Sequence, residues 1–246
     1  MTARGLTLVE LAVALAVSGI LLAAAGGMVA QHLRSLEGLT VRVETEEVSR
    51  TAFHVLGREV RVGRPGADWR LGDEAEVLSL RSFTGFARPC GWDAEAGEIT
   101  VAHQGWGTLE SQRDSVLVLP AEGDWRAVGV ERLGAGSEND CPLSALEGGG
   151  EVERWRLEPF VSHPVALRPF RKTVYHLADG ALRVEHGGAG RQPVTPERLA
   201  DGSFEVRDER VLHAELRLDA GPFAPDRTQR WTVRPLATTT PGAVEP

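Results

Sequence analysis

One long uncharged apolar run dominates the N-terminal part of the chain. Residues 11–30 contain no charged side chain. An α-helix rises about 1.5 Å per residue, so these residues would span the ~30 Å hydrocarbon core of a bilayer. The run therefore predicts a membrane-spanning helix.

The helical pattern continues beyond this run. Apolar side chains recur at three- to five-residue intervals, and charged side chains lie largely between them. The recurring apolar residues include Leu33, Leu36, Val43, Val48, Ala52, Val55, Leu56 and Val60. Gly63, Pro65 and Gly66 then break the pattern. We expect one helix from Leu6 to about Val62, half membrane anchor and half amphipathic spine.

The rest of the chain has the short alternating or β-branched runs that are typical of strands. The runs cover residues 76–83, 98–103, 115–119, 125–132, 152–157, 173–177, 181–185, 203–207, 214–218 and 230–233. Asp179 and Gly180 separate two of them and predict a hairpin turn. Glycines within 134–141 and 148–150 predict a long loop. The expected fold class is α+β, with the long N-terminal helix followed by a β-rich antiparallel head domain.

A single carboxylate, Glu10, lies at the edge of the apolar run. A charge at the centre of a bilayer costs on the order of 2.5 to 3.5 kcal/mol on insertion scales, so Glu10 needs a partner. A secretory signal peptide cleaved near residues 23–25 and a plain signal anchor are two alternatives for this N-terminus. Neither alternative gives a carboxylate at this position any use.

The residues around Glu10 resemble the leader and first turn of type IV pilins and type II secretion pseudopilins. Arg4 and Gly5 end a short basic leader, and Leu6, Thr7, Leu8 and Val9 lead to Glu10. The resemblance implies that prepilin peptidase cuts between Gly5 and Leu6, that the new amine of Leu6 is methylated, and that Glu10 is the fifth mature residue. Leu6 departs from the Phe or Met that most members of the family have there.

Cleavage after Gly5 would also supply a cationic partner for Glu10. It creates an ammonium group one helical turn before Glu10, and methylation keeps that positive charge. Buried charges are tolerated when they are paired, so Glu10 can pair with its own amine or with that of a neighbouring subunit during assembly.

Two further segments resemble the minor pilin W and pseudopilin J group, namely residues 48–61 and residues 175–183. The resemblance implies a non-enzymatic subunit of a type IV pilus or a type II secretion pseudopilus. It also implies an inner-membrane anchor, a periplasmic head, and prepilin peptidase and other pilin or pseudopilin subunits as partners. A tip subunit that is adhesive or captures DNA, and an anchored periplasmic domain unrelated to pili, remain alternatives.

The chain divides by composition into five parts. We expect a leader at residues 1–5, an apolar assembly helix at 6–30, an amphipathic spine at 31–64, a head at 65–237 and a flexible tail at 238–246. The formal net charge of −8 disfavours nucleic-acid binding by the chain as a whole, although it leaves a local basic patch open.

The two cysteines, Cys90 and Cys141, both lie beyond the predicted anchor. In an oxidising extracytoplasmic compartment they are a possible disulfide, and two free buried thiols are the alternative. Closing a loop of about 50 residues would stabilise the fold by roughly 4 kcal/mol in the chain-entropy model.

Catalytic and metal-binding patterns are sparse. The seven histidines are scattered, with no HExxH motif, and the chain has no GxSxG motif. We therefore expect no enzyme activity, no cofactor and no metal site. Two weaker candidates are calcium at residues 137–140 and an exposed, ligand-binding subset of the six tryptophans, against a solvated loop and core packing respectively. The tryptophans are Trp69, Trp92, Trp106, Trp125, Trp155 and Trp231.

Overall fold

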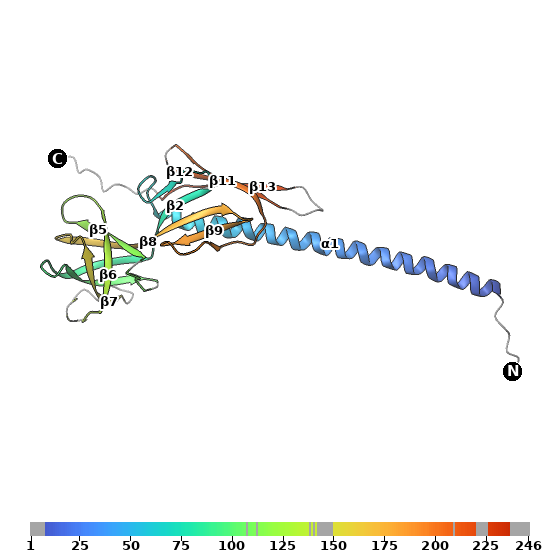
Figure 1. The fold of residues 1–246 in the computed structure, drawn as a ribbon, viewed down its shortest axis with the longest axis horizontal. Helices are drawn as coiled ribbons and strands as arrows, with labels where there is room; N and C mark the ends of the chain where they lie inside the picture. The colour runs from blue at the N-terminus through green and yellow to red at the C-terminus, as the bar shows by residue number, and fades with distance from the viewer. Residues whose placement is uncertain are drawn as a thin grey trace.

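The structure of the protein is a computed structural model. It describes residues 8–106, 108–111, 113–137, 139, 141, 150–208, 210–219 and 226–236. Within these residues one helix is followed by thirteen strands, so the expected α+β class is confirmed. The long helix projects from one end of a β-rich head (Figure 1).

The helix α1 (Leu8–Val62) has 55 residues, which corresponds to about 80 Å. Its side chains from residue 8 to residue 37 are all exposed, and its first buried side chain is Val41. The buried positions then follow the helical repeat, because they are Val41, Thr45, Val48, Ala52, Leu56, Gly57 and Val60. The helix ends at Val62, directly before the predicted break at Gly63. Leu6 lies outside the described residues.

All pairings between the named strands are antiparallel. The strands are β1 (Trp69–Leu71), β2 (Val77–Phe83), β3 (Gly85–Asp93), β4 (Glu98–Gly105), β5 (Asp114–Pro120), β6 (Arg126–Ala135), β7 (Glu151–Glu158), β8 (Pro164–Ala178), β9 (Ala181–His186), β10 (Gln192–Pro193), β11 (Leu199–Arg207), β12 (Val211–Leu218) and β13 (Arg227–Val233).

Six of these strands close into a barrel. Around the barrel they run in the order β3-β4-β7-β6-β5-β8, and β8 pairs with β3 to complete the circuit. The inward positions are mostly aliphatic and form a separate core. This core contains Ala87, Ile99, Val101, Val116, Val118, Val128, Val130, Trp155, Leu157 and Leu167. Alternation along each strand places these residues on one face, as a closed sheet requires.

A second core lies between α1 and the remaining strands. The C-terminal half of β8 leaves the barrel and pairs with β2 and β9, while β11, β12 and β13 form a separate sheet. These strands pack on the buried stripe of α1. The core includes Val48, Ala52, Leu56, Val60, Leu78, Tyr175, Leu182, Phe204, Leu212, Leu216 and Val233. The strand β8 therefore belongs to both cores (Figure 1).

Every predicted strand run overlaps a strand, and the hairpin at Asp179 and Gly180 is confirmed. Both turn residues have positive φ, at 48° and 76°, as a two-residue turn of this kind requires. One boundary was wrong, because β6 continues to Ala135 beyond the predicted loop start at Gly134. Gly134 has φ 141° at a bulge in β6, so glycine lets the strand continue where a loop was expected.

Candidate functional site: the N-terminal helix and the head it carries

The exposed half of α1 is the most unusual surface of the described chain. The helix contains an 18-residue window of mean hydropathy 2.3, and none of that window is buried. The helix is thus long and apolar enough to cross a membrane. Water strongly disfavours so large an apolar surface, so this half requires a bilayer or the apolar surfaces of other chains.

Glu10 lies in the first turn of α1 and is exposed. Negative charge in the first turn of a helix interacts favourably with the helix dipole. Glu10 shares a shallow groove with apolar and small side chains on the same face, Val9, Val13, Ala14, Val17 and Ser18. The predicted cleavage and methylation positions, Gly5 and Leu6, lie outside the described residues. The roles of all three residues therefore stay predictions.

Polar contacts fix the head on the second half of α1. Arg198, just before β11, donates from Nε to the carboxylate of Glu44 at 2.7 Å. Leu236, beyond β13, donates its backbone N–H to the carbonyl oxygen of Arg61 at 2.9 Å. Together with the apolar stripe, these contacts hold the head at both ends of the buried part of the helix.

The chain leaves α1 through a buried carboxylate. The Asp68 side chain is only 1% exposed and accepts from the backbone N–H of Arg64 at 2.9 Å and from Nη1 of Arg81 at 3.0 Å. Arg64 follows α1 and Arg81 lies on β2. Because a buried charge is stable only when paired, Asp68 fixes the helix end against the central sheet.

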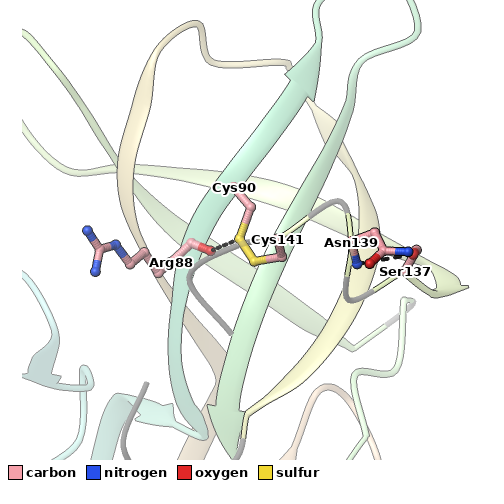
Figure 2. The surroundings of a disulfide bond; sticks show 5 residues. All are labelled: Arg88, Cys90, Ser137, Asn139 and Cys141. Carbon is pink, nitrogen blue, oxygen red and sulfur yellow. Dashed lines mark hydrogen bonds between the residues drawn. A yellow bond between two sulfur atoms is a disulfide. The ribbon is translucent and has the colours of Figure 1, made fainter. Parts of the chain in front are cut away.

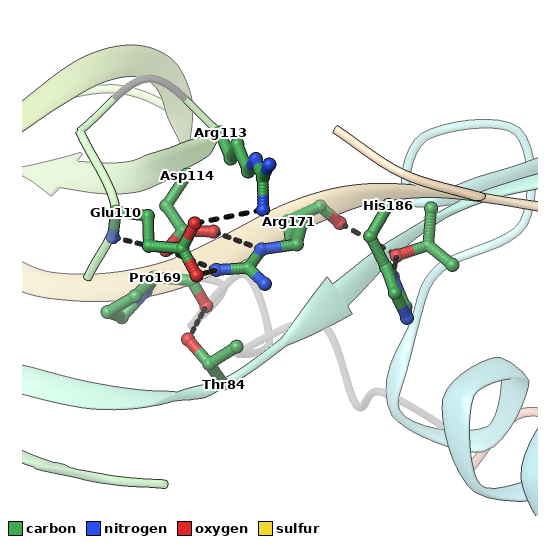
Figure 3. Close-up of polar contacts among 8 residues, drawn as sticks. Thr84, Glu110, Arg113, Asp114, Pro169, Arg171 and His186 are labelled. Atoms are coloured by element: carbon green, nitrogen blue, oxygen red, sulfur yellow. Dashed lines mark hydrogen bonds and ion pairs between the residues drawn. The ribbon is translucent and has the colours of Figure 1, made fainter. Parts of the chain in front are cut away.

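A second buried ion pair lies where β8 passes out of the barrel (Figure 3). Arg171 on β8 donates to both carboxylate oxygens of Asp114 on β5, at 2.6 and 2.9 Å. Asp114 also accepts the backbone N–H of Glu110 at 2.8 Å. The side-chain exposures are 21% for Arg171 and 2% for Asp114. This bidentate pair joins the barrel to the strand that continues into the helix-side core.

The structure brings Cys90 and Cys141 together in a disulfide, with Cα atoms 5.0 Å apart (Figure 2). Cys90 lies on β3, whereas Cys141 lies between β6 and β7. Cys141 is buried against the outward side chains of Ala102 on β4 and Val152 on β7. The bond therefore holds the segment after β6 across the outer face of the barrel and onto β3.

Burial perturbs titratable groups on α1 and in the head, among them Glu59 and His103. Burial raises the pKa of Glu59, on the face of α1 that meets the head. Burial lowers the pKa of His103 inside the barrel, where Nδ1 lies 3.8 Å from Glu153 Oε2. The Glu153 carboxylate also accepts hydrogen bonds from Arg132 Nε at 2.8 Å and from Trp155 Nε1 at 2.7 Å. This arrangement places a polar cluster inside the barrel.

The calcium candidate at residues 137–140 is only partly described, since residues 138 and 140 lie outside the described residues. Ser137 Oγ accepts the backbone N–H of Asn139 at 3.2 Å (Figure 2). In the part of the chain that the structure describes, no three His, Cys, Asp or Glu side chains gather as a metal site would require.

The tryptophans include both buried and exposed side chains. Trp69 and Trp155 are buried, whereas Trp92 and Trp106 are 46% and 60% exposed. The Arg58 guanidinium lies 4.6 Å from the centre of the Trp106 ring, so Trp106 joins the barrel to α1. Sequence reasoning missed the ion pairs of Asp68 with Arg81 and of Asp114 with Arg171, because these partners are 13 and 57 residues away along the chain.

The comparisons with known proteins concern the N-terminus alone. Residues 1–26 match the family described as the prokaryotic N-terminal methylation motif. Neither the curated proteins nor the solved structures give a match to the chain. The matched motif is the signature of type IV pilins and pseudopilins, which are structural proteins. Residues 1–26 thus carry this signature, and the helix that begins at Leu8 is long and apolar enough to cross a membrane.

Proposed function

We propose that the protein is a minor pilin or pseudopilin of the pilin W and pseudopilin J group, and that it has no catalytic role. Prepilin peptidase cuts between Gly5 and Leu6, and the Leu6 amine is methylated. Residues 6–30 anchor the subunit in the inner membrane, and the head, residues 65–237, lies in the periplasm. The helix then packs beside those of other subunits in a type IV pilus or a type II secretion pseudopilus.

The observation that carries this proposal is the separation between the head and the apolar surface. The head covers α1 only from residue 41, which leaves about 45 Å of helix projecting from residue 8 to residue 37. A plain anchor needs only to cross the bilayer. A subunit helix must also remain stable when it leaves the lipid, and the helices of other subunits supply the required apolar surroundings.

Glu10 gives the assembly a register. Inside an apolar helix bundle its carboxylate requires a cationic partner, and the methylated amine of a neighbouring subunit is one. We therefore expect Glu10→Ala to reach the membrane and to be cleaved, yet to be lost from purified fibres. Glu37→Ala is the matched control, because Glu37 is also an exposed carboxylate on α1.

The assay compares the variants in sheared fibre or pseudopilus fractions by immunoblot, with intact mass analysis of the N-terminus. The expected mature chain begins at Leu6 and carries one methyl group. Fibre incorporation of Glu10→Ala at the level of Glu37→Ala would contradict the assembly role. A functional chain that begins near Gly26, or that keeps residues 1–5, would contradict the processing.

One surface favours a second function, the capture of DNA by the head. An open groove of about 650 Å³ is lined by Arg61, Arg207, Arg234 and His213, together with Asp208, Val211 and Thr232. Its cations contrast with the acidic chain as a whole. Binding of a short duplex to the full chain, weakened by Arg61→Ala and by higher salt, would support this function. Equal binding of the duplex by the wild type and by Arg61→Ala would contradict this second function.

A further inference from the structure

The far end of the barrel holds a pocket. The strand β8 begins there at Pro164 and runs toward the helix-side core, so this end faces away from α1 (Figure 1). The pocket, here called the distal pocket, has a volume of about 520 Å³. Its lining is Pro120, Ala121, Glu122, Arg126, Phe160, Val161, Ser162 and His163. Its volume is in the range of small-molecule sites.

The two connections that form the distal pocket are held in place by the backbone. Ala121, which follows β5, donates its N–H to the carbonyl oxygen of His163 at 2.8 Å. His163 itself has φ 51°, a backbone conformation that residues other than glycine seldom adopt. Val161 is buried and packs in the barrel core, with Phe160 against it. The walls are thus attached to a rigid scaffold, as a preformed site requires.

The polar side chains of the distal pocket are not used in hydrogen bonds or ion pairs with other described residues. Glu122, Arg126, Ser162 and His163 are all exposed. Among the described residues, none of the four makes a side-chain hydrogen bond or an ion pair, whereas most arginines of the head are paired. Arg126 and Glu122 carry opposite charges, so the pocket favours neither an anion nor a cation. It offers both donors and acceptors to a neutral ligand.

An aromatic side chain lies beside the distal pocket. The Trp92 ring contacts the His163 ring edge to face, with centroids 5.5 Å apart, and Trp92 remains 46% exposed. An exposed indole is a flat apolar surface that a ligand can stack on at little cost in conformational entropy. Trp106 is also exposed, but the Arg58 guanidinium lies over its ring, and Trp106 is not among the residues that line the distal pocket.

We propose that the distal pocket binds a saccharide. A sugar ring has an apolar face of C–H groups, which matches Trp92 and Phe160, and a rim of neutral hydroxyl groups that donate and accept. Those hydroxyl groups match the carboxylate of Glu122, the guanidinium of Arg126 and the hydroxyl of Ser162. The site goes beyond subunit assembly, and it lies at the end of the molecule that is farthest from the anchor.

The test uses the full chain in a zwitterionic detergent without a sugar headgroup, because a glycoside detergent would compete for the site. A glycan array of bacterial and host oligosaccharides identifies the saccharides that the protein retains, and tryptophan fluorescence titration then measures their affinity. We expect Trp92→Ala and Arg126→Ala each to weaken binding by roughly tenfold, as expected when one stacking or charged contact is lost. Trp106→Ala and Arg154→Ala are the matched controls with exposed side chains outside the pocket.

Retention of a saccharide that is lost in Trp92→Ala and Arg126→Ala but kept in both controls supports the proposal. An array on which no saccharide is retained overturns it, as does binding that the pocket variants leave unchanged. Fibre incorporation is measured in parallel. Pocket variants that lose incorporation without loss of saccharide binding would show that the distal pocket is a subunit interface instead. Failure of the assembly proposal would leave saccharide binding by the full chain unaffected.

Discussion

The ion pair of Arg171 and Asp114 tests whether burial decides the strength of a salt bridge in this head. Arg171→Met removes the guanidinium and leaves the Asp114 carboxylate, which is 2% exposed, with the backbone N–H of Glu110 as its remaining donor. Breaking a buried pair costs about 3 to 5 kcal/mol. We expect about 3 kcal/mol, the lower end, because Arg171 is 21% exposed and water can partly replace it.

A double-mutant cycle separates the pair from the packing of its members. Asp114→Ala should cost less than Arg171→Met, since the guanidinium keeps its contact with Glu110 and with solvent. The double variant should therefore be more stable than the sum of the two losses predicts, with a coupling of about 2 kcal/mol. Urea unfolding of the full chain in detergent, followed by tryptophan fluorescence, gives these values. Coincident transitions by fluorescence and far-UV circular dichroism establish that one free energy applies.

The matched control is the pair of Arg230 and Glu215 in the small sheet. It has nearly the same geometry, with contacts of 2.7 and 3.2 Å, but side-chain exposures of 74% and 47%. Solvent screens such a pair, so its coupling should be far smaller. Equal coupling in the two cycles would refute the argument from burial, and so would a coupling below about 0.5 kcal/mol for Arg171 and Asp114.

Three further predictions concern the head and the part of α1 that it covers. Burial raises the pKa of Glu59, so its carboxyl group ionises at lower pH in the unfolded chain than in the folded chain. At pH 7 this difference destabilises the wild type, and Glu59→Gln should therefore unfold at a higher urea concentration. The difference between the two midpoints should vanish by pH 4, where the carboxyl group is largely protonated in both states. Burial lowers the pKa of His103 below 6.5, so as the pH falls the imidazole is protonated first in the unfolded chain. The free energy of unfolding of the wild type should therefore fall between pH 7 and 5.5, and that of His103→Gln should fall less. Parallel pH profiles of the two proteins would disprove this. Replacing Cys90 and Cys141 by serine, which opens a loop with a sequence separation of 51, should lower the free energy of unfolding by about 4 kcal/mol, and a reductant that leaves the wild-type midpoint unchanged would argue against it.

The sequence predicted the elements of this fold better than their arrangement. Alternation identified most strands of each core, and Gly63 marked the end of α1. The strand β3 was missed because Gly85, Pro89 and Gly91 interrupt its pattern, and a bulge between Pro89 and Gly91 accommodates them. The first half of β8 was missed for a similar reason, because Pro164 and Pro169 lie in it. Barrel closure depends on the pairing of these two strands, so it could not be predicted.

The candidate site divides in the same way. Glu10 and the Gly5–Leu6 position can be recognised in the sequence because the motif is local and contiguous. The distal pocket cannot, because its residues come from connections about 40 positions apart, 120–126 and 160–163, and only the barrel brings them together. The sequence could not predict that Trp92 is exposed, since a tryptophan on a strand has the same apolar side chain whether it faces the core or the solvent.

The passage of β8 through both cores has a mechanical consequence. The strand has 15 residues and is about 50 Å long. A tensile load applied at the outer tip of the barrel would be transmitted along this one strand. It would pass the Arg171 salt bridge and reach the sheet that packs on α1. The hydrogen bonds to β5 and β2 lie across the direction of pull and would be strained in shear as a group. The head is thereby suited to transmit force between its outer tip and α1.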